Sequence, residues 1–153
     1  MLALGSQGSG DAWEIAIAHP RDRQKPVVTL ALSNLSASTS GNSERGKTVA
    51  GRRIGHELDP RTGEPAPDFG SVTVVGPSGL IADILSTAFF VLGPEKGLEL
   101  SRRLRDEGVA QEVLFLIDRG TAIDAVASPG LEALILGADP SVRGLTIHPH
   151  SPF

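Results

Sequence analysis

Hydrophobic and polar residues alternate near the start of the chain. Apolar residues fill every second position from 13 to 18, and the run 26–33 is rich in Val and Leu. These two runs predict neighbouring antiparallel strands, joined by a polar turn at 19–22. The next segment, 36–41, consists of small residues that cannot bury much surface, so we expect a loop or an irregular strand there.

The sequence in the middle of the chain predicts a hairpin, a long loop and a short strand. The hairpin is predicted for 47–58, with its turn at Ala50-Gly51. Three prolines and two glycines in 59–70 predict a long loop instead of regular structure. A compact strand is expected at 71–76, because valines supply most of its bulk.

Spacings of three and four residues then predict helices. In 79–92 this spacing is kept by a set of apolar residues that we expect to face the core: Leu80, Ile81, Ile84, Leu85, Ala88, Phe89 and Leu92. Gly93 should end this helix, and a second helix should begin at Pro94 and end near Gly108.

Beyond the helices, the residues 111–117 predict another strand. Positions 121–136 fit either a pair of strands or a strand followed by a short helix at 130–136. The residues 148–153 contain two prolines and no periodicity, which predicts a loose tail. Together the elements predict one α+β domain over 1–147, with a largely antiparallel sheet packed against two main helices.

Composition excludes several classes of function. A net charge of −4 and an aromatic content of 4% argue against nucleic acid as a partner. Without cysteine, any metal must be held by oxygen or imidazole ligands. The chain as given has no basic, apolar leader and no apolar run of membrane-spanning length, so a cytoplasmic location is expected.

The first candidate for chemistry is the pair Asp83 and Thr87. Residues four apart lie on one face of a helix, so these two oxygens converge. An aspartate in an apolar helix fits a Mg²⁺ ligand, because Mg²⁺ prefers oxygen and keeps substrate phosphates in its shell. Alternatively, Asp83 complements the helix dipole and Thr87 packs through its methyl group.

Two further segments are candidates for binding a charged ligand. His56 stands close to Asp59 and Arg61 in a proline-fixed turn; the histidine is a possible base and the arginine a possible phosphate contact. The alternative is a turn in which Asp59 caps backbone amides and Arg61 braces it. The second segment, 36–45, is rich in small residues whose backbone can approach a ligand closely.

Four segments in one order carry a resemblance to a known family. They are T-S-G-N-S-E-R (39–45), H-E-L-D-P-R-T-G (56–63), S-V-T-V-V-G-P (71–77) and A-D-I-L-S-T-A-F-F-V-L-G (82–93). Together they resemble the FAD:protein FMN transferase (ApbE) family, of which this chain is similar to the carboxyl-terminal half. The resemblance extends from about Leu4 to Gly97, and more faintly to 113–117.

The resemblance implies a Mg²⁺-dependent enzyme that moves FMN from FAD to a threonine or serine hydroxyl of a target flavoprotein and releases AMP. It implies metal ligands at Asp83, Ser86 and Thr87 and a catalytic base at His56. Contacts with FAD are implied for five positions: Ser40, Gly41, His56, Leu58 and Asp59.

Other readings stay open at this point. Water could replace the protein hydroxyl, which would make the chain an FAD pyrophosphatase. The chain could also be an incomplete flavin- or partner-binding fragment that completes its site with an amino-terminal half or as a homodimer. A signal in an amino-terminal part would make the protein exported or membrane-anchored.

Overall fold

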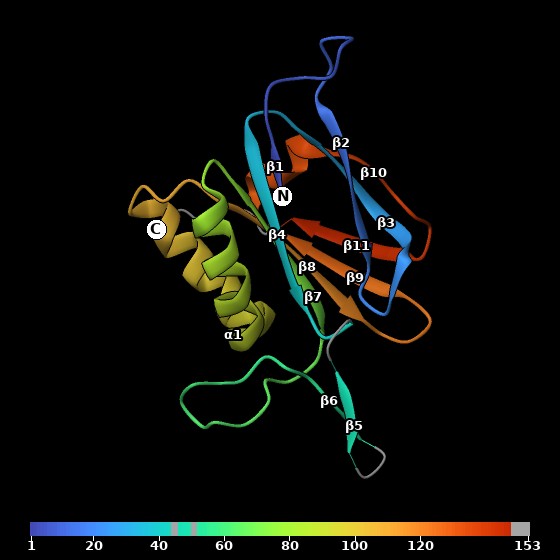
Figure 1. Cartoon of the computed structure of the whole chain (residues 1–153), viewed down its shortest axis with the longest axis vertical. Coiled ribbons are helices and arrows are strands. Elements are labelled where there is room, and N and C mark those ends of the chain that lie inside the picture. The colour runs from blue at the N-terminus through green and yellow to red at the C-terminus, as the bar shows by residue number, and fades with distance from the viewer. Residues whose placement is uncertain (44–45, 50–51, 148–153) are drawn as a thin grey trace.

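A computed structural model describes residues 1–43, 46–49 and 52–147 of the chain. Its main sheet has six strands, in the spatial order β1 (Leu2–Ala3), β4 (Leu35–Gly41), β7 (Gly70–Gly76), β8 (Glu112–Asp118), β9 (Ile123–Ala127) and β11 (Val142–Ile147) (Figure 1). A second sheet has the order β10 (Ile135–Ala138), β3 (Asp22–Leu32) and β2 (Trp13–His19). Among these neighbours only β9 and β11 run parallel.

A two-stranded hairpin and two helices complete the fold. A two-stranded hairpin is formed by β5 (Lys47–Val49) and β6 (Arg52–Ile54). The helix α1 (Gly79–Asp106) covers one face of the main sheet, and a short 3-10 helix, η1 (Pro129–Leu134), leads into β10. Within the described residues, no helix combines the length and the hydropathy needed to cross a membrane.

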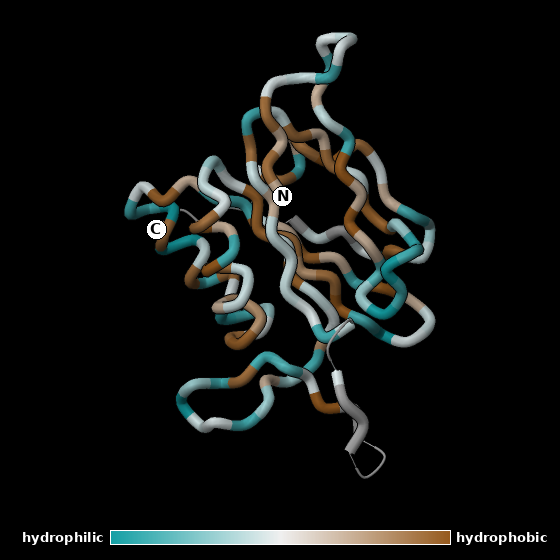
Figure 2. The backbone as a smooth tube through the Cα atoms, viewed as in Figure 1, coloured by the Kyte–Doolittle hydropathy of each residue, from teal (hydrophilic) through white to brown (hydrophobic). Residues whose placement is uncertain are grey.

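The main sheet lies between α1 and the second sheet, so both of its faces are covered. All seven residues of β7 are buried, and their side chains alternate between two cores. Val72 and Val74 pack with Phe89 and Phe90 of α1, whereas Val75 packs on the side of the second sheet. Figure 2 shows hydrophobic positions concentrated along the strands of both sheets.

Most of the predicted elements are confirmed. The structure contains the first two strands, the 47–58 hairpin, the irregular 59–70 loop, and the strands predicted at 71–76 and 111–117. The hairpin strands end at Ile54, earlier than predicted, and its expected turn at Ala50-Gly51 lies outside the described residues. The α+β class with a largely antiparallel sheet is also confirmed.

The interpretation of 36–41 as a loop or an irregular strand is wrong. These residues belong to β4, a regular strand in the main sheet that pairs with β7 from Ser36 to Gly41. Ser36, Ala37 and Ser40 are buried there. Small side chains allow α1 to approach the strand closely, so a segment that contributes little apolar surface is nevertheless covered.

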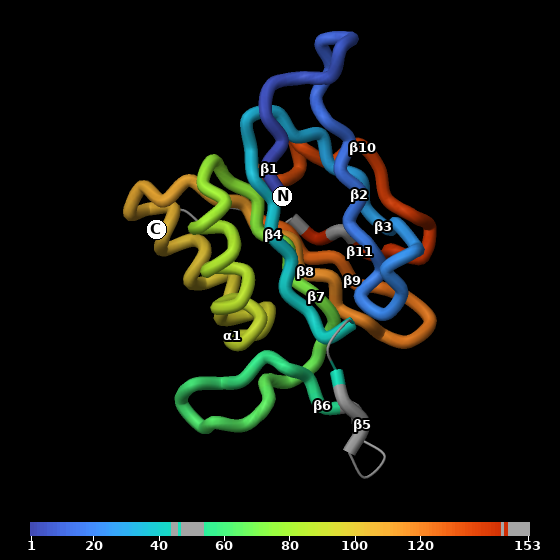
Figure 3. The backbone as a smooth tube through the Cα atoms, in the orientation of Figure 1, coloured from blue at the N-terminus to red at the C-terminus, as the bar shows by residue number. Residues whose placement is uncertain are grey.

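The predicted pair of helices appears as one kinked element. Gly93 has non-helical backbone angles (φ 78°, ψ 172°) and Pro94 follows it, so the helical hydrogen bonding is interrupted where the sequence indicated. Figure 3 shows the chain changing direction within α1. The second half ends at Asp106, and Gly108 takes the left-handed conformation (φ 87°) that glycine favours after a helix.

The predicted apolar face of the first helical half is only partly in the core. Phe89 is fully buried, but Leu80 is 71% exposed, Ile84 55% exposed and Ile81 38% exposed. Instead, the first turns of α1 contact β4 through Gly79 and Asp83, and Leu80 lines a hollow beside Met1 and Leu2.

Positions 121–136 follow the second of the two alternatives. The strand β9 is followed by η1, which is a 3-10 helix and begins at Pro129, slightly earlier than predicted. The tail predicted at 148–153 lies outside the described residues.

Candidate functional site

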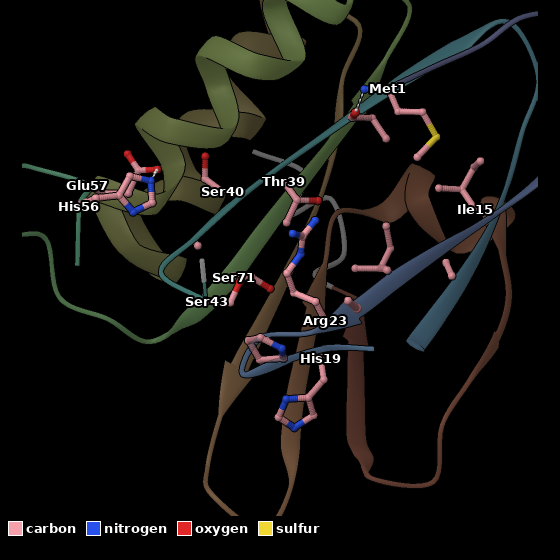
Figure 4. Close-up of a pocket in the computed structure, with 16 residues that line it drawn as sticks. Met1, Ile15, His19, Arg23, Thr39, Ser40, Ser43, His56, Glu57 and Ser71 are labelled. Carbon is pink, nitrogen blue, oxygen red and sulfur yellow. Dashed lines mark hydrogen bonds and ion pairs between the residues drawn. The ribbon is translucent and has the colours of Figure 1, made fainter. Parts of the chain in front are cut away.

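A pocket of about 330 Å³ lies between β4 and the hairpin formed by β2 and β3. Residues from both sides line it, as Figure 4 shows: Ile15, His19, Arg23, Thr39, Ser40, Ser43, His56, Glu57 and Ser71. The lining therefore combines apolar strand residues with hydroxyl, imidazole and charged groups. Three of the residues expected to contact FAD, Ser40, Gly41 and His56, belong to this pocket.

The alternating side chains of β4 separate this pocket from α1. The hydroxyls of Ser38 and Ser40 point toward the helix, where they contact residues of its first half. Thr39 points to the opposite face and shares a hydrogen bond of 2.8 Å with Thr73 of β7. Alternate side chains of this strand therefore form hydrogen bonds on opposite faces of the sheet.

An oxygen-rich cluster forms where α1 crosses β4. The Ser38 hydroxyl donates to Asp83 Oδ1 at 2.8 Å, and Ser86 Oγ donates to the Asp83 carbonyl at 3.0 Å. Ser40 Oγ lies 3.1 Å from Ser86 Oγ and 3.3 Å from Thr87 Oγ1. The structure therefore brings together the three positions expected to bind metal, and it adds two serines from the neighbouring strand.

The donors in this cluster fit a hard divalent cation. One carboxylate, several hydroxyls and a backbone carbonyl are oxygen ligands of the kind Mg²⁺ binds. Nowhere in the described residues do three His, Cys, Asp or Glu side chains converge. A cation at this place would accordingly depend on a single carboxylate, Asp83, together with neutral oxygens.

His56 lies at the end of the pocket near Ser40, on the segment that follows β6. Its backbone N–H donates to the side-chain oxygen of Asn42 at 3.2 Å, which fixes the segment against the end of β4. Its Nε2 lies 3.4 Å from Glu57 Oε1. This carboxylate favours a proton on Nε2, which leaves Nδ1 with its lone pair available.

Gly55 has no room for a side chain beside this contact. A Cβ atom there would overlap the side chain of Asn42. A glycine is therefore required for the segment to approach Asn42 and present His56 at the pocket.

Leu58 and Asp59 do not line the pocket. Leu58 is 56% exposed and forms an isolated bridge with Pro65. Asp59 accepts two hydrogen bonds from the Arg61 guanidinium, at 2.8 and 2.6 Å, and one from the Arg61 backbone N–H at 2.9 Å. The side-chain hydrogen bond from Arg61 is the main cause that lowers the pKa of Asp59 to about 2. This is the braced turn that the sequence offered as the alternative to a ligand contact.

The tip of the β2–β3 hairpin is tied to the far side of the pocket by an arginine. Arg21 contacts Asp68 at 2.6 Å and Asp118 at 2.8 Å, and so links the hairpin to the 59–70 loop and to the end of β8. The hydrogen bond from Arg21 lowers the pKa of Asp118. The arrangement fixes one wall of the pocket.

Sequence reasoning did not single out Ser38 or Asn42. The signal for Ser38 was present, because Ser36, Ser38 and Ser40 repeat with the period of a strand. Asn42 is fully buried, but its contact with His56 joins residues fourteen positions apart and has no signature in the sequence.

The fold and the site together define an α+β domain with an oxygen-lined site between a helix and one strand of the main sheet. The sequence pattern of the ApbE family matches residues 1–111. The chain belongs to the ApbE family.

Relatives and solved structures agree with this assignment. A FAD:protein FMN transferase from Klebsiella pneumoniae is 33% identical over 139 residues, and one from Treponema pallidum is 41% identical over 125 residues. These matches cover 90% and 74% of this chain. The crystal structure of the flavinyl transferase ApbE from Pseudomonas stutzeri, in its apo form, is similar with a TM-score of 0.66 and 34% identity over 90% of this chain.

The chain is much shorter than these proteins. It spans 38% of the Klebsiella pneumoniae relative, 34% of the Treponema pallidum relative and 41% of the Pseudomonas stutzeri structure. The similarity therefore concerns one part of a larger architecture.

Proposed function

We propose that this chain carries the metal and base half of an FAD:protein FMN transferase site, which moves FMN from FAD to a threonine or serine hydroxyl of a target flavoprotein. The observation that carries the proposal is the convergence of Asp83, Ser86 and Thr87 with Ser38 and Ser40. The names of the relatives support FAD as the donor and a protein as the acceptor.

In this proposal Asp83, Ser86 and Thr87 would hold Mg²⁺, which would neutralise negative charge on the FAD diphosphate. Ser38 orients the Asp83 carboxylate through its 2.8 Å hydrogen bond. Ser40 positions the hydroxyls of Ser86 and Thr87. The two serines of β4 thus fix the geometry of the three ligands on α1.

His56 acts as the base for the acceptor hydroxyl. Its Nδ1 accepts the proton, because Glu57 favours the tautomer protonated at Nε2. The hydroxyl oxygen then forms a bond to the phosphorus of the FMN portion, the diphosphate bond breaks, and AMP leaves with the bridging oxygen. With water in place of the hydroxyl, the same steps would release free FMN.

Calorimetric titration of the purified chain with FAD, with and without MgCl₂, tests the proposal. We expect magnesium-dependent binding that is lost in Asp83→Ala, because the variant removes the only carboxylate of the cluster. Asp106→Ala is the matched control, since Asp106 is an exposed aspartate in the last turn of the same helix.

Binding should persist in Asp106→Ala. A folded chain that binds no FAD in the presence of MgCl₂, or equal binding by both variants, would contradict the proposed metal site. If binding is confirmed, incubation with FAD and a flavoprotein acceptor separates the two reactions, because labelled protein indicates transfer and free FMN indicates hydrolysis.

A further inference from the structure

Two carboxylates lie close together where the loop before β7 joins the main sheet. Beyond the last residue pair of the β7–β8 ladder, the Asp118 N–H donates to the Phe69 carbonyl at 2.8 Å. This register brings Asp68, the residue before Phe69, to the end of β8. The side chain of Asp68 is 19% exposed and that of Asp118 is 17% exposed. Two negative charges held together in a partly buried place require a cation between them.

A single arginine supplies this cation. Arg21 Nη1 donates to Asp68 Oδ2 at 2.6 Å, and its Nε donates to Asp118 Oδ2 at 2.8 Å. The other oxygen of Asp68 is buried and has no hydrogen-bond partner in the described part of the chain, so Arg21 supplies the hydrogen bond that compensates this carboxylate. Arg21 lies in the turn between β2 and β3, 47 residues before Asp68 in the chain.

The loop between β6 and β7 is closed by contacts of its own. The Ala66 N–H donates to the Glu57 carbonyl at 2.8 Å, and Leu58 forms a bridge with Pro65. These contacts join the two ends of the loop, so Glu57 and Ala66 should move as one unit. Because His56 directly precedes Glu57, the place of its imidazole depends on where this loop is anchored.

The loop is anchored at both ends. At its start, the His56 N–H donates to the side-chain oxygen of Asn42 at 3.2 Å, which is the long end of the usual range. At its end, the Phe69 ring packs on Phe90 at a centroid distance of 4.9 Å, and Asp68 is held by Arg21. The weak contact at the start leaves much of the anchoring to the end that Arg21 holds.

We propose that Arg21 is a positioning residue for the transfer reaction: by binding Asp68 and Asp118 together it fixes the loop between β6 and β7, and with it the imidazole of His56. Arg21 acts through the loop and does not touch the substrate. The inference rests on the proposed role of His56 as the base. A displacement of about 1 Å caused far from the chemistry can lower a rate about a hundredfold, so a remote ion pair can control the reaction.

Amide hydrogen exchange measured by NMR tests the anchoring without any substrate. In Arg21→Gln we expect the Ala66 amide to exchange at least about tenfold faster, because the loop opens locally. The Val74 amide, in the middle of β7, should change less, which separates local opening from a loss of overall stability. Arg119→Gln is the matched control, since Arg119 pairs with Asp124 at 2.7 Å outside this loop, and it should leave the Ala66 amide unchanged.

Steady-state transfer from FAD to a flavoprotein acceptor tests the effect on the reaction. We expect Arg21→Gln to lower kcat by about ten- to a hundredfold. The KM for FAD should change by a smaller factor, because the oxygen cluster on α1 is untouched. Arg119→Gln should keep both constants. Arg21→Lys restores the cation and should recover part of kcat, but not all of it, because lysine lacks the two separate nitrogens that bind the two aspartates.

A double-variant cycle assigns the effect to the contact between Arg21 and Asp68. Asp68→Asn keeps the shape of the side chain and removes its charge. If the two residues act through their contact, the double variant with Arg21→Gln should lower kcat no further than Arg21→Gln alone. Asp68→Asn also tests the inference by itself if Arg21→Gln does not fold, because it too should speed exchange at Ala66 and lower kcat.

Several results would overturn the inference. They are an unchanged Ala66 amide in Arg21→Gln, a rise in KM with no fall in kcat, and additive losses in the double variant. A wild-type chain that transfers no FMN would instead overturn the proposed function, and with it the role of Arg21 in the reaction. The exchange of the Ala66 amide would still decide whether Arg21 anchors the loop, so the two failures are distinguishable.

Discussion

At the scale of single residues, the ion pair between Asp59 and Arg61 makes the free energy of unfolding depend on pH in acid. The pKa of Asp59 is about 2 in the folded chain, mainly because of the hydrogen bonds from Arg61. In the unfolded chain an aspartate has a pKa of about 3.9. The turn therefore stabilises the fold fully above about pH 4, and this contribution is lost as the pH falls through 2.

The matching experiment is an NMR titration of the Asp59 carboxyl carbon. In Arg61→Ala we expect its pKa to rise toward the ordinary value for aspartate. Arg119→Ala is a suitable control, because Arg119 forms a similarly exposed ion pair with Asp124 elsewhere in the chain. A pKa of Asp59 that stays near 2 without Arg61 would contradict the assigned cause.

The sequence anticipated the site residues unevenly. Asp83 and Thr87 were predictable from helical spacing, and the structure does place them together beside β4. The contribution of Ser38 was not predicted, because it depends on which face of a strand meets the helix. The roles of Leu58 and Asp59 in binding FAD remain predictions, and in this structure both lie outside the pocket.

At the scale of elements, the packing of α1 on the main sheet depends on Gly97. A Cβ atom at this position would lie 2.6 Å from Cζ of Phe115, whose ring is fully buried. The absent side chain lets the second half of the helix rest on the aromatic rings beneath it, with Phe89 and Phe115 at a centroid distance of 6.5 Å.

We expect Gly97→Ala to destabilise the chain by about 1–2 kcal/mol in urea unfolding. Overpacking costs ~1–3 kcal/mol, and the better helix propensity of alanine offsets at most ~1 kcal/mol of this. Gly137→Ala is the control, because a Cβ atom there contacts nothing within 4 Å. Equal effects of the two substitutions would mean that the close approach of α1 is not needed.

Some boundaries of helices and strands can be predicted from the local sequence alone, and others cannot. Gly93 and Pro94 interrupt α1 by their own backbone preferences, so the kink was predictable from sequence. The strand β4 was not predictable, because its stability comes from pairing with β7, at least thirty residues away, and from the cover that α1 provides. Apart from Thr39, its small residues have little strand propensity.

At the scale of the whole molecule, the main sheet belongs to both cores, and this should make unfolding cooperative. Leu114 and Leu116 of β8 pack toward the second sheet, whereas Val113 and Phe115 of the same strand pack toward α1. Neither outer layer can lose its packing without exposing the central one.

We expect Trp13 fluorescence, which reports on the second sheet, and helical circular dichroism, which reports on α1, to give coincident urea transitions. Leu30→Ala, at a fully buried position of β3, should shift both transitions together by about 2–5 kcal/mol. Leu136→Ala is the control, because Leu136 is 57% exposed. Separate midpoints would contradict a single cooperative unit.

By itself the sequence determined the type and order of most elements, the break in the helix, and the motifs of the ApbE family, because these depend on local periodicity, on Gly and Pro, and on residue identity. Only the tertiary structure decided that Ser38 of β4 donates to the Asp83 carboxylate and that Asn42 accepts from the backbone N–H of His56 beside the pocket. These features arise from contacts between distant segments and from which face of each strand is covered, and no local pattern records either.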